Sequence, residues 1–249
     1  MIKVVYHEDY NQLYTSDPAA APGRIQAVVA ALQGKVVWVK PEPASELDIL
    51  QCHTPEHIKA VEWENVYDIA ALAAGGAIMA AQIGLTEPCF ALIRPPGHHA
   101  SRDSSWGFCY FNNMAIAIDK LYRQGQIKKA FILDFDLHFG DGNVDILGTR
   151  AYITIRNPSA HKRADYLQEV EKALAETDAD LIAASAGFDN AEKDWGGLLK
   201  AEDYTAMGRW MREAARRNQG GCFGILEGGY NHAVLGQNVL AFIQGLGGE

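Results

Sequence analysis

The chain has 249 residues, of which 48% are hydrophobic and 21% are charged, a composition typical of globular proteins. This length corresponds to one or two domains, and because no linker interrupts the sequence, we expect a single domain over residues 1–249. The net charge of −9, from 22 basic and 31 acidic residues, argues against a nucleic-acid binder, since phosphate contacts require a basic surface.

The sequence gives no indication of a membrane or secreted protein. No run approaches the roughly 18 apolar residues that a spanning helix needs, and the segment from Met1 to Tyr6 lacks the architecture of a signal peptide. We therefore expect a cytoplasmic protein with neither membrane nor nucleic-acid partners. The cysteines form no CxxC pair and are expected to be free thiols; they are Cys52, Cys89, Cys109 and Cys222.

Strand-like and helix-like segments alternate along the whole chain. Short apolar runs predict strands at Lys3–Tyr6, Val36–Val39, Cys89–Ile93, Ala130–Asp134, Ala151–Ile155, Leu181–Ser185 and Cys222–Leu226. Helical periodicity predicts helices at Arg24–Leu32, Val66–Leu85, Asn113–Arg123, Tyr166–Glu176 and Glu202–Arg217. This alternation is typical of an α/β fold, in which helices cover both faces of a largely parallel sheet.

Polar and glycine-rich loops follow four of the predicted strands. Ligands of open α/β sheets bind beyond the carboxyl ends of the strands. We therefore expect these loops to converge on one edge of the sheet and to form the functional site there. The four loops are Arg94–His99, Leu133–Gly142, Ser185–Asp189 and Glu227–Asn231.

Three residues in these loops are candidate metal ligands. Asp136 and His138 stand two residues apart at the end of a strand, so their side chains point to the same face. Asp189 could supply a third ligand, and three protein ligands with an open position are typical of catalytic zinc, although iron(II) or cobalt(II) would also fit. A single Asp-x-His is more often a loop or a cap. Here Asp134 and Asp141 add charge that a cation would relieve.

Other loop residues could transfer protons or bind an oxyanion. His98 and His99 follow a Pro-Pro-Gly turn, and a histidine base is commonly oriented by a carboxylate; a polar surface loop is the alternative interpretation. Tyr230 follows two glycines and could donate to an oxyanion, although such a tyrosine taken alone is more often structural. The segment Gly107–Phe111 is either a channel wall or core. No dinucleotide, Walker or nucleophilic-serine motif is found.

Five motifs, taken in order, resemble the zinc-dependent histone deacetylases. The likeness is closer to the class II and bacterial branch, which includes acetylpolyamine amidohydrolases and acetoin-utilisation proteins. The resemblance implies an arginase-like α/β fold with an eight-stranded, largely parallel sheet. The motifs are Arg94–Ala100, Gly107–Cys109, Asp134–Asn143, Ser185–Asp189 and Glu227–Asn231, with a weaker likeness at Ala21–Arg24 and in the helix containing Gly75 and Gly76.

The resemblance also implies a role for each matching residue. Asp136, His138 and Asp189 would bind one zinc ion. His99 would be the general base and acid, and His98 its electrostatic partner. Asp134 and Asp141 would be the carboxylates behind His98 and His99 respectively, and Asp134 would also belong to a monovalent-cation (K⁺) site. Tyr230 would stabilise the oxyanion. Gly107 and Phe108 would form a channel wall, and Arg24 would line an internal cavity.

The implied activity is the hydrolysis of N-acetylated amines, such as acetyl-lysine or acetylpolyamines, by a zinc-dependent enzyme. One alternative is an acyl-lysine-binding protein without catalysis, but the implied catalytic residues are all present. The other is an arginase-type ureohydrolase with two manganese ions, which the tandem histidines and the Glu-Gly-Gly-Tyr motif disfavour.

The chain departs from the family pattern around the expected substrate channel. The stretch between Gly142 and Ser185 is short, and Ile155–His161 stands where the second channel wall is expected. Trp195 stands near the position of the usual rim residue. These departures leave substrate preference open, and a homo-oligomer could close the shortened wall.

Overall fold

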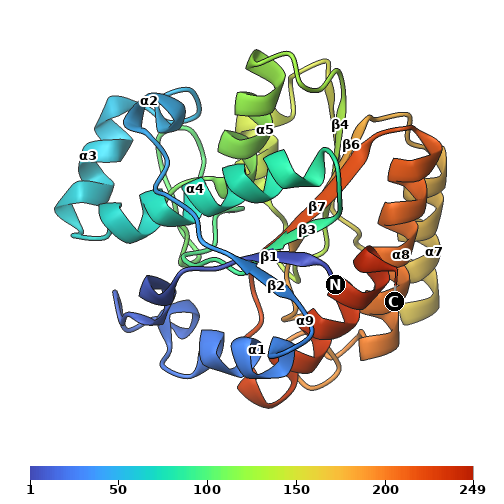
Figure 1. Cartoon of the computed structure of the whole chain (residues 1–249). Helices are drawn as coiled ribbons and strands as arrows, with labels where there is room; N and C mark the ends of the chain where they lie inside the picture. Colours follow the sequence, from blue (N-terminus) through green and yellow to red (C-terminus); the bar gives the residue numbers. More distant parts are fainter. Residues whose placement is uncertain (249) are drawn as a thin grey trace.

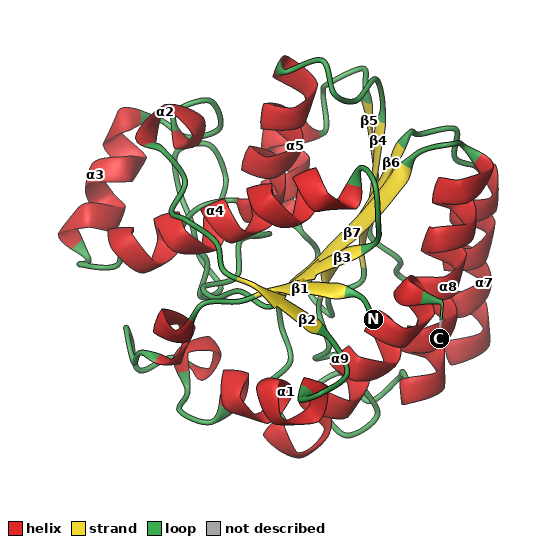
Figure 2. Cartoon of the chain, in the orientation of Figure 1, coloured by secondary structure: helices red, strands yellow, loops and turns green. Residues whose placement is uncertain are grey.

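The computed structural model describes residues 1–248, and a single parallel sheet lies at its centre (Figure 2). Its strand order is β2-β1-β3-β7-β6-β4-β5, and every neighbouring pair is parallel. The strands are β1 (Lys3–Val5), β2 (Val37–Val39), β3 (Cys89–Ala91), β4 (Ala130–Asp134), β5 (Ile153–Arg156), β6 (Leu181–Ala186) and β7 (Gly221–Leu226).

The sheet confirms the predicted α/β fold class but corrects the strand count. The sheet has seven strands in the described residues, where the resemblance implied eight. The physical reason is that each predicted apolar run forms one strand, and no further run is left to form another.

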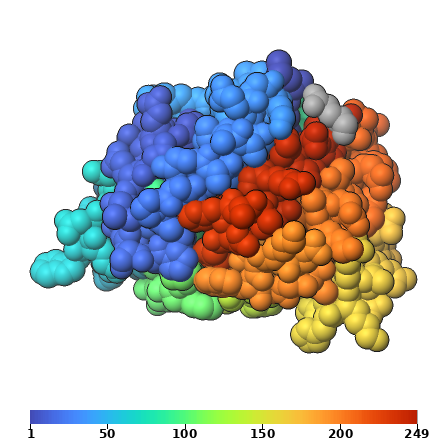
Figure 3. Space-filling view, turned by 90° about the horizontal axis from the view of Figure 1, so that it is seen from below, coloured from blue at the N-terminus to red at the C-terminus, as the bar shows by residue number. Residues whose placement is uncertain are grey.

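Helices cover both faces of the sheet (Figure 1). On one face α4 packs against α5, and on the other α1, α9, α8 and α7 form a row of contacting helices. Figure 3 shows α1, α9 and α8 side by side, in blue, red and orange. The helices are α1 (Arg24–Leu32), α2 (Glu46–Ile49), α3 (Pro55–Trp63), α4 (Tyr67–Gly84), α5 (Asn113–Arg123), α6 (Asp141–Leu147), α7 (Arg163–Glu176), α8 (Ala201–Arg217) and α9 (His232–Gly247).

All five helices predicted from the periodicity are present, as α1, α4, α5, α7 and α8, and the fold adds α2, α3, α6 and α9. Helices α1 and α5 begin and end at the predicted residues. Helix α9 was missed because it is apolar on most sides and contains several glycines. One of them, Gly236, lies where α9 crosses α1.

Helix α4 is long and apolar enough, by length and composition, to cross a membrane, with a mean hydropathy of 1.2 over 18 residues. This corrects the expectation that no run of this kind exists. In the fold 67% of the window is buried, because α4 packs against β3, β7 and α5. Its apolar composition is accounted for by the core. All four cysteines are also buried and free, as expected.

The loops expected to form the site follow four neighbouring strands at the middle of the sheet. These strands are β3, β7, β6 and β4, in that spatial order. The register places Asp134 opposite Ser185, and Ser185 opposite Ile225. The chain therefore leaves these strands at nearly the same level, and the predicted convergence of the loops is confirmed.

Replacing Gly236 by Ala should destabilise the packing of α9 on α1. A Cβ at this position would lie 2.5 Å from the Ala27 carbonyl oxygen and 2.9 Å from Ala31 Cβ. Overpacking of this kind costs about 1–3 kcal/mol, which should lower the thermal midpoint by several degrees.

The matched control is Gly247→Ala, on the same helix. A Cβ there would meet only Ile2, at 3.5 Å, which is an ordinary van der Waals distance. We expect thermal unfolding of this variant to be unchanged or slightly improved, because Ala favours the helix. An equal loss in both variants would contradict the proposed close contact at Gly236.

Candidate active site

Asp136, His138 and Asp189 come together beyond the ends of β4 and β6. One ligand atom from each lies within 4.8 Å of the others. Nδ1 of His138 lies 3.1 Å from Oδ1 of Asp136 and 3.0 Å from Oδ2 of Asp189. Both carboxylates are buried, whereas the imidazole is partly exposed. The structure thus brings together the three residues that were predicted as metal ligands.

Backbone N–H groups hold the two carboxylates in place. Asp136 accepts hydrogen bonds from the N–H of His138, at 2.9 Å, and of Gly228, at 2.8 Å. Asp189 accepts one from the N–H of Leu137 through Oδ1, at 3.0 Å. Its other oxygen is buried and, despite the nearby His138 ring, has no hydrogen-bond partner among the described residues. An unpaired carboxylate oxygen within an Asp–His–Asp set fits a divalent cation.

The charges of this cluster shift one another's pKa. Burial and the charge of Asp136 raise the pKa of Asp189 to about 6. Hydrogen bonding to Asp136 and the nearby charge of Asp189 raise the pKa of His138 to about 10. Burial raises the pKa of Asp136, but the charge of His98 and hydrogen bonds from His138 outweigh it and leave that pKa low. A metal ion would replace the His138 proton, because the ligand is the neutral imidazole.

The tandem histidines lie beside this cluster, and each is paired with one carboxylate. Nδ1 of His98 lies 3.2 Å from Oδ2 of Asp134, and Nδ1 of His99 lies 2.6 Å from Oδ1 of Asp141. Nε2 of His98 is 3.8 Å from Oδ1 of Asp136. These are the pairs that the family resemblance implies, and the rings of the two histidines are 4.0 Å apart between centroids.

The two imidazoles have opposite electrostatic environments. Burial lowers the pKa of His98, but the charges of Asp136 and Asp134 outweigh burial and raise this pKa well above its usual value. For His99, burial and the nearby charge of His98 lower the pKa to about 4. These surroundings favour the protonated form of His98 and the neutral form of His99. If His99 carries its proton on Nδ1, facing Asp141, its Nε2 is left free to accept a proton.

Tyr230 is surrounded by side chains that the sequence placed in the channel or cavity. Trp195 stacks on it, with 4.1 Å between ring centroids, and Phe108 meets it edge-on at 5.9 Å. The guanidinium carbon of Arg24 lies 5.5 Å from the centre of the phenol ring. Burial raises the pKa of Tyr230 far above its usual value. The phenol therefore keeps its proton and can act as a hydrogen-bond donor.

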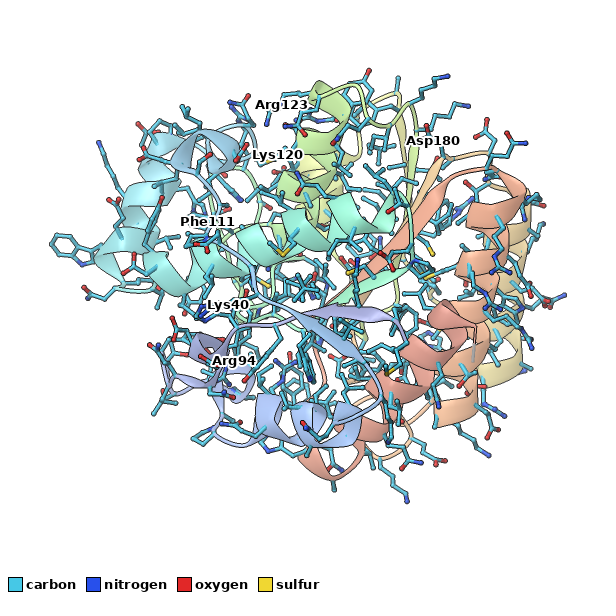
Figure 4. The ribbon with its side chains drawn as sticks, in the orientation of Figure 1. Lys40, Arg94, Phe111, Lys120, Arg123 and Asp180 are labelled. Atoms are coloured by element: carbon cyan, nitrogen blue, oxygen red, sulfur yellow. The ribbon has the colours of Figure 1, made fainter. Side chains whose placement is uncertain are left out.

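Arg24 holds the loop that carries Tyr230. Its guanidinium is fully buried and donates to the carbonyl oxygens of Gly229, at 2.8 Å, and Glu227, at 2.5 Å. A second fully buried arginine, Arg94, is labelled in Figure 4 beside the N-terminal segment. Its guanidinium donates to carbonyl oxygens of Gln12, Ala19 and Ala21, and Ala19 also accepts a longer hydrogen bond from Arg24, at 3.5 Å.

Two buried histidines support the loop that contains Gly107 and Phe108, and they were not predicted. Nδ1 of His53 pairs with the carbonyl oxygen of Ser101 at 3.0 Å, and its Nε2 accepts the N–H of Asn112 at 2.9 Å. The rings of His53 and His57 both pack on Phe111, which is labelled in Figure 4. Their four-residue spacing was the available signal, but their partners lie about fifty positions away.

Two acidic residues that were not predicted anchor the site loops. Glu227 is buried and accepts the N–H of Gly97, at 2.7 Å, and of His98, at 3.3 Å; burial raises its pKa to about 7. Asp194 accepts the N–H of Tyr230 at 2.8 Å. Glu227 lies in the motif Glu227–Asn231, but the sequence does not show that it contacts the backbone of Gly97 and His98.

A cavity of about 290 Å³ opens beside the cluster of Asp136, His138 and Asp189. Its lining includes Asp136 and His138, together with Asn190 and the loop formed by residues 157–161. This loop belongs to Ile155–His161, which the sequence placed at the missing channel wall. The shortened segment thus leaves open space next to two of the predicted ligands.

The sequence matches the histone deacetylase domain over residues 19–165 and 148–246. The chain belongs to the histone deacetylase family. Similar proteins include a probable deacetylase of Archaeoglobus fulgidus, 31% identical over 92% of this chain and 81% of the relative. A histone deacetylase-like amidohydrolase of Pseudomonas aeruginosa is 28% identical over 88% of this chain and 73% of the relative. The polyamine deacetylase HDAC10 of Mus musculus is 27% identical over 99% of this chain and 48% of the relative.

The family and the expectation of an enzyme that acts on amides are confirmed by these relatives. The crystal structure of the HDA15 HD domain shares the fold, with a TM-score of 0.86 and 24% identity over 100% of this chain and 90% of that one. The two matched segments of the family domain overlap over residues 148–165. This overlap falls within the stretch between Gly142 and Ser185, which the sequence analysis found to be short for the family.

Replacing Arg24 by Lys should displace the loop that carries Tyr230. A lysine ammonium cannot reproduce the fork of donors that reaches both Gly229 and Glu227. We expect kcat for amide hydrolysis to fall at least about tenfold, and the protein to lose roughly 1–3 kcal/mol of stability.

Arg94→Lys is the matched control, because Arg94 is equally buried but binds carbonyl groups of the N-terminal segment. It should lose comparable stability in thermal unfolding and keep most of its kcat. Equal losses of kcat in the two variants would show that Arg24 has no special connection to the site.

Proposed function

We propose that this protein hydrolyses N-acetylated amines to acetate and free amine, with one zinc ion held by Asp136, His138 and Asp189. The observation that carries the proposal is the buried Asp–His–Asp cluster, in which one oxygen of Asp189 accepts no hydrogen bond and lies 3.0 Å from Nδ1 of His138. Three protein ligands leave a position open for substrate or water. The names of the relatives, deacetylase and amidohydrolase, support the same reaction.

His99 is the proposed general base and acid. Bound zinc would supply Lewis-acid polarisation of the acyl oxygen and of the attacking water. His99 accepts the proton of that water at Nε2 and later gives it to the leaving nitrogen, which cannot depart as an amide anion. Asp141 accepts from Nδ1, 2.6 Å away, and so fixes which nitrogen is free.

Two further residues balance charge during the reaction. His98 lies 3.8 Å from Oδ1 of Asp136, and its protonated form, which the buried carboxylates favour, would offset their negative charge. Tyr230 keeps its proton and donates it in a hydrogen bond to the oxyanion. Loss of a comparable donor has cost about 2.7–4 kcal/mol in other hydrolases.

We further propose that Asp134 contributes to a K⁺ site. Its Oδ2 is paired with His98 and with Nδ2 of Asn143, at 2.9 Å. Its Oδ1 is buried and has no hydrogen-bond partner in the described part of the chain. Main-chain oxygens of the same loop would complete the coordination of the cation.

The shortened wall favours a broad range of amine carriers. With less protein around the carrier, discrimination rests mainly on the acyl end of the substrate. We therefore infer that acetyl-lysine peptides and acetylpolyamines are both substrates, with kcat/KM values within about two orders of magnitude. The four free thiols support a cytoplasmic location, and a homo-oligomer could cover the open side.

Metal content and activity should both depend on Asp189. Zinc-loaded protein should contain one divalent ion per chain and release acetate from an acetyl-lysine peptide and an acetylpolyamine. Asp189→Ala should lose most of both, because it removes one of three ligands. Asp178→Ala, which changes an exposed surface carboxylate, should alter neither.

Elemental analysis and acetate release, measured on the same samples, check this prediction. Two manganese ions per active chain would indicate a ureohydrolase. Full activity in metal-free protein would contradict the proposed chemistry.

The proton-transfer and oxyanion groups should separate by kinetics. His99→Ala and Tyr230→Phe should each lower kcat by about two to three orders of magnitude with metal content preserved. His98→Ala should be milder, because His98 acts only through its charge. Steady-state kinetics, metal analysis and thermal unfolding test these variants together. A larger loss of kcat for His98→Ala would reverse the two assigned roles.

A further inference from the structure

Trp106 has no role in the reaction as proposed so far, although it lies against the proposed base. Its side chain is 54% exposed. The indole lies on the imidazole of His99, with 3.8 Å between ring centroids and 30° between planes. An indole left in solvent loses the benefit of burial, so this position calls for a local reason.

The indole and the imidazole bind the two oxygens of one carboxylate. Nε1 of Trp106 donates to Oδ2 of Asp141 at 2.8 Å, while Nδ1 of His99 lies 2.6 Å from Oδ1. The Asp141 side chain is 42% exposed. With His99 as its one partner, such a carboxylate could rotate and exchange this bond for water. A second donor on the other oxygen fixes the plane of the carboxylate relative to the imidazole.

The backbone after Trp106 forms a tight turn next to His99. The φ angles of Gly107 and Phe108 are +59° and +68°, and the N–H of Cys109 donates to the Trp106 carbonyl at 3.1 Å. A Cβ on Gly107 would overlap the His99 imidazole. A left-handed conformation is costly for Phe, so packing around the turn maintains it. The turn therefore fixes the indole against His99.

Trp195 provides a comparison at the same site. It is also 54% exposed, and it stacks on Tyr230. Among the described residues, no hydrogen bond is recorded from its indole N–H, in contrast to that of Trp106. The two tryptophans thus differ in the one contact that leads to the proposed base.

We propose that Trp106 is a positioning residue, which holds Asp141 and covers one face of His99 so that Nε2 of His99 keeps one direction. The proposal rests on the amide hydrolysis proposed above, with His99 as the proton-transfer group. Trp106 acts through Asp141 and the ring of His99. Its loss should therefore change the rate of proton transfer and leave substrate binding intact.

Trp106→Phe is the informative variant, because it keeps a ring over His99 and removes the N–H. With an acetyl-lysine peptide and zinc-loaded protein, we expect kcat to fall roughly 10- to 100-fold, as for other small misplacements of catalytic groups. KM, zinc content and thermal midpoint should be unchanged. Once Asp141→Ala has removed the acceptor, adding Trp106→Phe should change kcat less than about twofold.

Two other tryptophans serve as controls. Trp195→Phe removes an equally exposed indole. In the double variant with Asp141→Ala, the fold-loss of kcat should equal the product of the two single losses. Trp63→Phe changes a side chain that is 89% exposed at the end of α3, and it should leave kcat and KM unchanged. A raised KM with unchanged kcat in Trp106→Phe would make Trp106 a channel wall. Full multiplication with Asp141→Ala would show that it does not act through that carboxylate.

A readout without turnover separates this proposal from the proposed reaction. In NMR spectra of the zinc-loaded protein, the Nδ1–H of His99, assigned with His99→Ala, should exchange with solvent at least about tenfold faster in Trp106→Phe. This result in a protein that releases no acetate would overturn the hydrolysis and leave the positioning intact. Unchanged exchange would overturn the role of Trp106 whatever the activity.

Discussion

Three carboxylates lie buried at the ends of two neighbouring strands, and the arrangement of the site depends on compensating their charge. Asp134, Asp136 and Asp189 are each almost fully removed from water, which is costly unless hydrogen bonds or cations balance them. Backbone N–H groups and the imidazoles of His98 and His138 supply part of this balance. The remaining unpaired oxygens, on Asp134 and Asp189, are those at which the proposed cations would bind.

A second set of contacts fixes the flexible parts of the site to the rigid sheet. Arg24, in α1, donates hydrogen bonds to the backbone just before Tyr230. His53, in the segment before α3, forms a hydrogen bond with the loop that contains Trp106. In both cases a buried side chain pairs with main-chain groups of the loop, and these main-chain groups are present whatever side chains the loop carries. The proposed catalytic side chains therefore stand on loops that buried hydrogen bonds connect to neighbouring elements.

The sequence predicted what is local and missed what depends on tertiary contacts. Apolar runs such as Ala130–Asp134 become strands because a buried parallel strand needs an apolar residue at nearly every position. The Asp136–His138 pair could be read because its geometry follows from a spacing of two. The contact between Trp106 and Asp141 spans 35 positions. No sequence pattern around Trp106 distinguishes a tryptophan that positions a neighbouring side chain from one that lines the rim of a channel.

The sheet order determines when the site can exist at all. Strand β7 comes last in the chain but lies between β3 and β6. Until it inserts, the part that carries His98 and His99 has no strand pairing with the part that carries Asp136 and Asp189. A chain that lacks β7 would thus hold the proposed base and the proposed metal ligands on two parts with no strand pairing between them. Such non-local pairing is slow, and it couples assembly of the proposed site to completion of the sheet.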